Sequence, residues 1–228
     1  GVHLCQAWLQ HHGAPDQAIF DVERLSQPDI AALAAAVPDS RCLALDARLM
    51  QALASVESGQ GVAFVVAPPQ PLPPEAVDEN CVLFDRIQDP GNVGTLLRTC
   101  AAAGVKRVFL ATGTAAAWSS KVLRSGQGAH FALAIHEHVD LPALLPILRV
   151  PLVATALEGA QDLYAGRLPE RCAWVFGHEG QGVAADLLAA ARLKLRIPHD
   201  MAAVESLNVG AAAAICLFEQ RRQALSAR

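Results

Sequence analysis

The sequence predicts an α/β protein in two parts, a small α/β unit followed by a larger domain built on a parallel sheet. Short apolar runs alternate with helical patterns along the chain, which is typical of sheets covered by helices. The segment APPQPLPPEAVDEN at 67–80 holds five prolines, and proline favours extended spacers and cannot continue a helix. We therefore expect a small domain at 1–67, a proline-rich linker at 68–80 and a larger domain at 81–228.

The first unit is expected to alternate helices and strands. A helical pattern opens it, with Leu4, Trp8 and Leu9 on one face. The expected strands are AIF (18–20), RCLALD (41–46) and GVAFVVA (61–67), and further helices are expected at 30–37 and 47–56. Because the chain begins inside a helical pattern, we expect its natural start to be missing.

The larger domain is expected to hold six buried strands separated by helices. Continuous apolar runs of this length are typical of parallel strands that are covered on both faces. The strands are expected at 81–84, 107–111, 131–135, 151–156, 173–177 and 193–198, and the helices near 92–103, 118–125, 140–148, 183–191 and 207–224. Such sheets bind ligands in the loops beyond the carboxyl ends of their strands, so a functional site is expected there.

Composition excludes several classes of protein. No apolar run reaches the roughly 18 to 20 residues that cross a bilayer, and the first residues lack the features of a secretory signal, so we expect a soluble, cytoplasmic protein. The six cysteines include no CxxC pair, which indicates reduced and mostly buried thiols. The histidines lack the HExxH spacing, so no metal site is expected.

The net charge of −4 is unevenly distributed. Residues 1–79 have a net charge of −7, whereas residues 80–130 hold six basic side chains against two acidic ones. A basic middle in an acidic protein suggests contact with a polyanion such as RNA, although random clustering of charge explains it equally well.

The loop after the first strand of the larger domain is the tight turn DPGN at 89–92. Asn92 is a good N-cap for the helix that follows, and Gly94 lets a backbone or a ligand approach its first turn. Arg98 lies in the second turn beside a packed apolar stripe. It is either an ordinary surface charge or has a partner.

Two further loops follow strands. GHEGQG at 177–182 has glycines that let a backbone pass close to another group, but it matches neither GxGxxG nor a Walker motif. Glu179 in this loop either anchors Arg98 or is a solvated acid. In the third loop Ser206 is an N-cap candidate for the last helix. The run VGAAAAICLF at 209–218 predicts that this helix is buried all round or lies against another subunit.

Taken in order, these loops resemble a known family. NVGTLLR (92–98), GHEGQGV (177–183) and IPHDMAAVESLNVGAAAA (197–214) resemble the three motifs of the SpoU/TrmH family of RNA 2′-O-ribose methyltransferases, in the SPOUT superfamily. KVLRSGQGAHF (121–131) resembles a further segment between the first two motifs. The resemblance covers about 80–228, and the preceding unit is similar to the L7Ae-like substrate-binding domain of many members.

The resemblance implies methyl transfer from S-adenosylmethionine to a ribose 2′-hydroxyl in RNA. It also implies a deep trefoil knot formed by the second and third motif loops and the last helix, which is rare among proteins. A homodimer in which one subunit completes the RNA site of the other is implied too, and ribosomal RNA is favoured over transfer RNA. The implied cofactor contacts are Thr155, Ala156, Phe176, Gly177, Gly182, Ile197, Ser206, Leu207 and Asn208.

Carried over residue by residue, the resemblance gives Arg98 the central catalytic role. Since the pKa of arginine exceeds about 12, Arg98 is a poor base, and we expect it to hold the RNA phosphate and orient the hydroxyl. The residues expected to position it and the substrate are Asn92, Glu179, Ser206 and Asn208. The expected RNA-binding side chains are Arg86, Arg98, Lys121 and Arg124.

Two features depart from the family pattern. The third loop is one residue longer than usual, which leaves the contacts of residues 199–203 open. The first unit is acidic although it is expected to help hold RNA, and phosphate binding relies on Lys and Arg. Either the RNA contacts lie mainly on the basic catalytic face, or a basic leader was removed.

Two alternatives compete with this interpretation. One is a catalytically inactive RNA-binding relative of the same fold, from which binding of S-adenosylmethionine would distinguish an enzyme. The other is an ordinary doubly wound enzyme with a nucleotide cofactor, whose GxGxxG motif is missing from this sequence.

Overall fold

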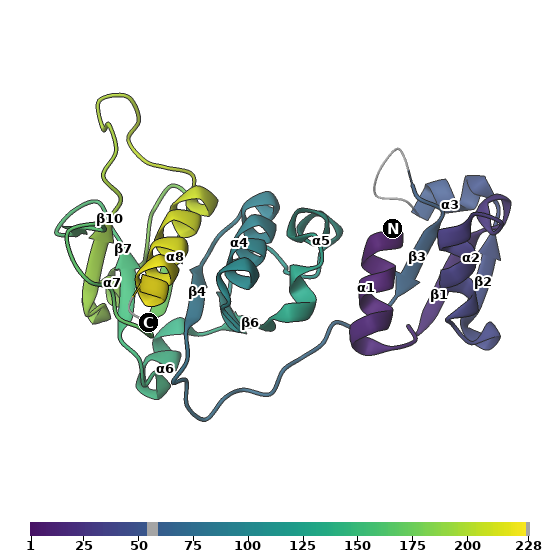
Figure 1. The fold of residues 1–228 in the computed structure, drawn as a ribbon, viewed down its shortest axis with the longest axis horizontal. Coiled ribbons are helices and arrows are strands. Elements are labelled where there is room, and N and C mark those ends of the chain that lie inside the picture. The colour runs from purple at the N-terminus through teal and green to yellow at the C-terminus, as the bar shows by residue number, and fades with distance from the viewer. Residues whose placement is uncertain (54–58, 227–228) are drawn as a thin grey trace. The chain divides into compact units, whose positions relative to one another are not determined.

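The structure is a computed structural model that describes residues 1–53 and 59–226. The chain divides into two compact units, Gly1–Pro69 and Gln70–Arg228, each with its own hydrophobic core (Figure 1). No helix among the described residues is long and apolar enough to cross a membrane. The six cysteines are free and all but Cys42 are buried, as expected for reduced thiols.

The first unit is a three-stranded sheet with helices, in the strand order β2-β1-β3. β1 pairs in parallel with β2 and antiparallel with β3. The strands are β1 (Gln17–Asp21), β2 (Cys42–Leu45) and β3 (Val62–Val65), and the helices are α1 (Val2–His12), α2 (Pro28–Ala35) and α3 (Ala47–Leu53). The predicted alternation is thus confirmed for the described residues. Residues 54–56, the predicted end of the third helix, lie outside them.

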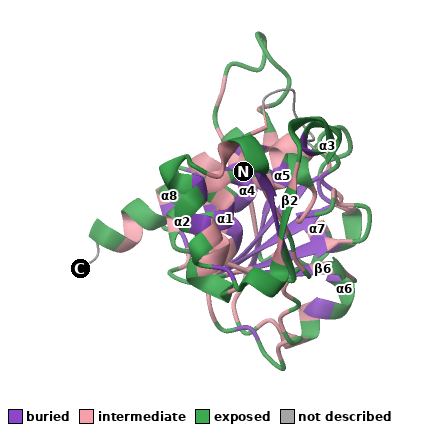
Figure 2. Ribbon diagram, turned by 90° about the vertical axis from the view of Figure 1, so that its right-hand side faces the viewer, coloured by how far each residue is buried: buried purple, intermediate pink, exposed green. Residues whose placement is uncertain are grey.

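The second unit is a seven-stranded sheet in the order β6-β5-β4-β9-β7-β10-β8, and its pairings are all parallel. The strands are β4 (Cys81–Asp85), β5 (Arg107–Ala111), β6 (Ala134–Val139), β7 (Leu152–Thr155), β8 (Gln161–Asp162), β9 (Ala173–Gly177) and β10 (Leu193–Arg196). The predicted parallel sheet is confirmed. β4 and β9 are buried along their whole length, as their continuous apolar sequences indicated (Figure 2).

Helices cover both faces of this sheet. They are α4 (Pro90–Ala103), α5 (Ser120–Gly126), α6 (Leu141–Leu144), α7 (Ala185–Ala190) and α8 (Val209–Ser226). Side chains alternate along a strand, so Val82 and Phe84 of β4 join the core under α4, α5 and α8. Leu83 points to the opposite face and joins the core with α6 and α7.

The strand predicted at 131–135 begins later than expected. Residues Ala129–Ala132 form a 3₁₀ turn that starts at Gly128, whose φ of 84° is left-handed, and β6 begins only at Ala134. The buried His130 ring, whose Nε2 lies 2.8 Å from Ala117 O, holds this turn against the preceding segment. The two-residue strand β8 was not predicted, because it is too short to show a pattern.

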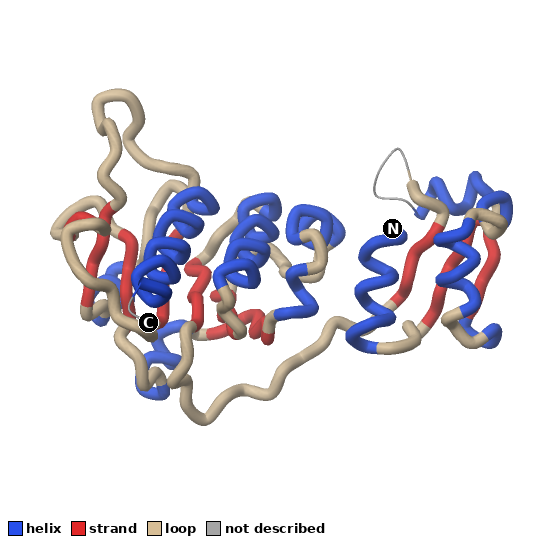
Figure 3. Tube along the Cα trace, in the orientation of Figure 1, coloured by secondary structure: helices blue, strands red, loops and turns tan. Residues whose placement is uncertain are grey.

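β10, the last strand in sequence, lies between two strands that come earlier in the chain. β10 pairs with β7 on one side and with β8 on the other, although β7 and β8 are joined directly by the preceding chain. α8 follows β10 after the long loop 197–208 (Figure 3). Gln220, buried in α8, accepts from Trp174 Nε1 (2.9 Å) and donates to Pro169 O (3.0 Å). These bonds join α8 to β9 and to the segment before it.

Candidate functional site

Three loops lie at one edge of the sheet because the strands before them run parallel in the same sheet. They follow β4 (86–89), β9 (178–184) and β10 (197–208). A cavity of about 600 Å³ lies against the last two loops and the loop after β7. All but one of the predicted cofactor contacts line it, namely Thr155, Ala156, Phe176, Gly182, Ile197, Ser206, Leu207 and Asn208.

Gly177, the exception, has a different neighbour. A Cβ atom on Gly177 would lie 2.2 Å from Gly182 C and 2.2 Å from Val183 N, so the loop returns against its own first residue. Gly182 takes a left-handed φ of 70°, which favours glycine. Gly177 and Gly182 therefore allow two parts of the backbone to lie in close contact, and Gly182 also lines the cavity.

Asp89, not Asn92, caps the helix after β4. Its side chain accepts from the backbone N–H of Asn92 (2.8 Å), and Pro90 occupies the first turn. Proline suits this position because its missing N–H would have had no partner there. The prediction that Asn92 is the N-cap is wrong, and the Asn92 side chain is left for other contacts.

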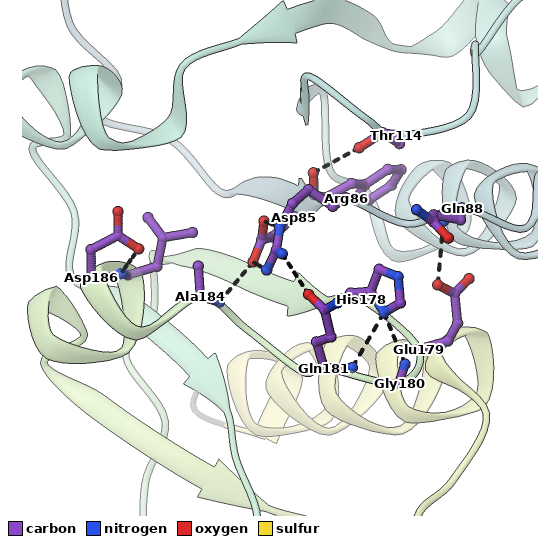
Figure 4. Close-up of polar contacts among 12 residues, drawn as sticks. Asp85, Arg86, Gln88, Thr114, His178, Glu179, Gly180, Gln181, Ala184 and Asp186 are labelled. Carbon is purple, nitrogen blue, oxygen red and sulfur yellow. Dashed lines mark hydrogen bonds and ion pairs between the residues drawn. The ribbon is translucent and has the colours of Figure 1, made fainter.

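Those contacts join all three loops. Asn92 Nδ2 donates to Glu179 Oε1 (3.0 Å), and Asn92 Oδ1 accepts from Asn208 Nδ2 (2.9 Å). The other Glu179 oxygen accepts from the backbone N–H of Gln88 (3.2 Å) (Figure 4). Residues far apart in sequence thus form one polar chain beside the cavity.

The charge of Glu179 is stabilised by this arrangement. Partial burial raises the pKa of its carboxyl group, but hydrogen bonds from the Asn92 side chain and from nearby backbone N–H groups outweigh that effect. The net result is a pKa below the ordinary value. Glu179 therefore anchors α4 and the loop after β4, and its hydrogen bonds run to Gln88, Asp89 and Asn92, not to Arg98.

Asn208 also caps α8. Its Oδ1 accepts from the backbone N–H of Gly210 (2.9 Å) and of Ala211 (3.3 Å). The prediction that Ser206 is the N-cap is wrong because the helix begins only at Val209, and Ser206 lies exposed on the cavity wall. A Cβ on Gly210 would lie 3.0 Å from Thr95 Cγ2, so α8 and α4 approach closely.

Arg98 stands apart from this group. Its side chain is exposed on α4, and it is not among the residues that line the cavity. Within residues 1–53 and 59–226 its side chain makes no hydrogen bond or ion pair. The structure thus brings together four of the five predicted catalytic residues, and Arg98 is the one left out.

The predicted RNA-binding side chains differ in their surroundings. Lys121 and Arg124 are exposed on α5. Gly94 lets α5 pack against α4, since a Cβ there would lie 2.7 Å from Val122 O. Arg86 instead binds within the protein, to both Asp85 oxygens (2.7 and 3.1 Å) and to Gln181 Oε1 (2.8 Å).

Sequence reasoning missed several polar residues of the cavity wall, including Glu158, Arg196 and Glu205. His199 closes the lengthened third loop, with Nδ1 2.8 Å from Ile197 O and Nε2 3.4 Å from Glu205 O. The signal that could have found these residues is their place at the strand ends, because Glu158 and Glu205 lie in the loops after β7 and β10 and Arg196 is the last residue of β10. In the described part of the chain, no group of three or more potential ligands is placed to hold a metal ion.

Comparison with solved structures shows the same fold. An S-adenosylmethionine-bound rRNA methyltransferase from Sinorhizobium meliloti superposes with a TM-score of 0.79 at 26% identity, over 97% of this chain and 85% of that one. The SpoU methyltransferase AviRb from Streptomyces viridochromogenes gives a TM-score of 0.84 at 23% identity, over 100% and 90%. The trefoil knot follows from this SPOUT fold, in keeping with the position of β10 between β7 and β8.

Comparison of sequences gives matches over almost the whole chain. The 23S rRNA (guanosine(2553)-2′-O)-methyltransferase RlmP of Bacillus subtilis is 36% identical over 97% of this chain and 86% of its own length. The 23S rRNA (guanosine-2′-O-)-methyltransferase RlmB of Pseudomonas putida is 30% identical over 98% and 95%. The model of the SpoU rRNA methylase family matches residues 79–218. The chain therefore belongs to the SpoU rRNA methylase family.

Proposed function

We propose that this chain transfers a methyl group from S-adenosylmethionine to a ribose 2′-hydroxyl of ribosomal RNA. The observation that carries this proposal is the cavity beside α8, which gathers the loops after β7, β9 and β10. The methyltransferases named above share this fold and family, and the one from Sinorhizobium meliloti binds the cofactor.

The cavity fits a molecule of that chemistry. Its volume of about 600 Å³ lies within the range of about 300–1,000 Å³ typical of small-molecule sites. Phe176, Ile197 and Leu207 supply apolar surface, while loop backbone and Asn208 supply polar groups. Such a wall suits an adenosine with a charged amino-acid tail. When bound, S-adenosylmethionine supplies a methyl group activated by its sulfonium.

The relatives favour guanosine in 23S rRNA as the substrate. Those that match across almost the whole of this chain carry that substrate in their names. Two solved structures named for transfer RNA match only 66% and 67% of this chain. We therefore favour ribosomal over transfer RNA, which would place the protein in the cytoplasm.

The residues of this chain are assigned the following roles. Arg98 holds the RNA phosphate and orients the attacking hydroxyl, because a guanidinium donates strong hydrogen bonds to phosphate and is a poor base. Asn92, Glu179 and Asn208 fix α4 and its arginine relative to the cavity through their hydrogen bonds. The exposed hydroxyl of Ser206 contacts the substrate or the cofactor at the cavity wall.

A second copy of the chain completes the site in this proposal. Ala211 and Phe218 of α8 are exposed and Ala214 is half-buried, so an apolar stripe runs along the helix at spacings of three and four residues. An exposed apolar stripe is typical of a helix that packs against another subunit. Arg98 does not line the cavity of its own chain. In the proposed dimer, Arg98 of the partner subunit reaches this cavity instead. Size-exclusion chromatography with light scattering would detect the dimer.

RNA contacts are assigned mainly to the basic side of the second unit. Lys121 and Arg124 are exposed on α5, which packs against α4. The first unit is proposed to be the RNA substrate-binding domain, with shape and polar contacts more important than charge because it is acidic. Replacing Lys121 by alanine should weaken RNA binding and reduce its salt dependence.

One experiment tests the function directly. Purified protein is incubated with labelled S-adenosylmethionine and either 23S rRNA, assembled large ribosomal subunits or transfer RNA, and modified nucleotides are mapped. We expect label on a guanosine of 23S rRNA, at the position equivalent to 2553 in the Bacillus subtilis relative. No cofactor binding and no transfer to any RNA would instead support an inactive RNA-binding relative.

A further inference from the structure

Arg86 follows β4 directly and has an unusual backbone. Its φ of 57° is left-handed, a conformation uncommon for residues other than glycine. Holding a bulky residue there has an energetic cost, which other contacts must offset. Backbone strain of this kind indicates that the position of the Arg86 side chain matters to its surroundings.

The contacts of Asp85 show what offsets this strain. Asp85 is 3% exposed at the end of β4, and its carboxylate accepts from Arg86 Nε (2.7 Å) and Arg86 Nη2 (3.1 Å). Asp85 Oδ2 also accepts from the backbone N–H of Ala184 (2.7 Å), which ends the loop after β9. A buried carboxylate thus holds both Arg86 and the far end of the glycine-rich loop.

Arg86 reaches the middle of the same loop. Its Nη1 donates to Gln181 Oε1 (2.8 Å), and Gln181 lines the cavity (Figure 4). Within the loop, His178 Nδ1 accepts from the backbone N–H groups of Gly180 (3.0 Å) and Gln181 (3.2 Å). Asp85 and Arg86, here called the clasp, therefore fasten residues 178–184 at two points.

We propose that Arg86 is a positioning residue for the cofactor loop, acting through Gln181, and that it does not contact RNA. The segment 177–182 holds three glycines in six residues, and such a segment loses much conformational freedom when it is ordered. The clasp orders this loop before the ligand arrives, so less of the binding free energy is spent on ordering it. This inference rests on the proposed function and names a role beyond it.

The test compares cofactor and RNA binding across a set of variants. Arg86→Gly removes the guanidinium without backbone strain, and Gln181→Ala removes the loop partner without exposing Asp85. Each should raise the Kd for S-adenosylmethionine about tenfold, the usual effect of losing one charged hydrogen bond. The double variant should bind no more weakly than either single one. RNA affinity and its salt dependence should not change in Arg86→Gly, in Gln181→Ala or in the double variant.

Controls separate the clasp from general effects. Arg192→Ala removes another exposed arginine and should leave cofactor affinity unchanged, while Lys121→Ala should weaken RNA binding alone. Amide hydrogen exchange at Gly180, Gln181 and Gly182 in the free protein should speed up about tenfold in the Gln181→Ala variant. This measurement needs no cofactor and would still test the clasp if the proposed function were wrong.

The outcomes separate the two proposals. Failure of the unaltered protein to bind S-adenosylmethionine would overturn the proposed function. The amide hydrogen exchange measurement would then be the test of the clasp. Normal cofactor affinity and exchange in the Gln181→Ala variant would overturn the clasp. Weaker RNA binding by Arg86→Gly with normal cofactor affinity would also overturn it and make Arg86 an RNA contact. If Arg86→Gly fails to fold because Asp85 is unpaired, cofactor affinity and amide exchange in Gln181→Ala decide between the outcomes.

Discussion

Asn92 and Glu179 are 87 positions apart in sequence, and Asn92 Nδ2 donates to Glu179 Oε1 across 3.0 Å. This bond joins α4 to the glycine-rich loop after β9. Asn208 donates to the other side of the same amide across 2.9 Å, so the start of α8 is joined as well. A single side chain thereby sets the relative positions of all three loops beside the cavity.

The charge of Glu179 should make this junction sensitive to acid. Its pKa is below the ordinary value in the folded protein, so its contribution to stability is complete above the unfolded value of about 4.3 and is lost as the pH falls through the folded value. Urea unfolding of the native protein and Glu179→Gln between pH 7 and pH 3 checks this. The difference in unfolding free energy should be small, because Glu179 is exposed, and should shrink as the pH falls. A difference that does not change with pH would contradict the assignment.

Arg98 should be required for turnover but not for cofactor binding. Arg98→Ala removes a charged donor without touching the cavity wall, so the Kd for S-adenosylmethionine should stay unchanged while kcat falls about 10² to 10³-fold. Arg98→Lys keeps the charge but loses the planar fork, and should recover only part of the rate. Calorimetry and a methyl-transfer assay measure the two quantities. Arg192→Ala is the matched surface control, and turnover close to normal in Arg98→Ala would remove Arg98 from the proposed site.

The packing of α5 on α4 should depend on Gly94. A Cβ there would lie 2.7 Å from Val122 O, a backbone atom that cannot rotate away. Gly94→Ala should therefore lower the unfolding free energy by about 1–3 kcal/mol, despite alanine's better helix propensity. Gly166→Ala is the control, since nothing lies within 4 Å of its Cβ position. Equal stability of the two variants in urea unfolding would show that α5 can shift freely.

The sequence predicts the sheet and its loops well, because both follow from local patterns. Buried parallel strands are continuous apolar runs, and the loops after β4, β9 and β10 carry the expected glycines and polar residues. The helix caps were predicted wrongly at Asn92 and Ser206. Several residues near each helix start can cap it, and the true start decides between them.

Arg86 shows a different limit of sequence reasoning. Its charge and its place in a basic segment predicted an RNA contact. Its partner Gln181 lies 95 positions away, and no local pattern reveals that pairing. The left-handed backbone conformation of Arg86 could not be predicted either, because in a sequence only glycine indicates such a conformation. Contacts between distant loops therefore had to come from the structure.

The proposed dimer should reveal itself when two inactive variants are mixed. Arg98→Ala and Ser206→Ala damage different parts of the proposed site. If each site combines Arg98 of one subunit with the cavity of its partner, a mixed dimer has one intact and one doubly damaged site. Random exchange of equal amounts makes half of the dimers mixed, so activity should recover to about a quarter of normal. If both residues act within one chain, no mixed dimer holds an intact site. Co-expression of the two variants in equal amounts, followed by the methyl-transfer assay on the unseparated dimers, measures the recovery, and activity no higher than that of the separate variants would contradict a shared site.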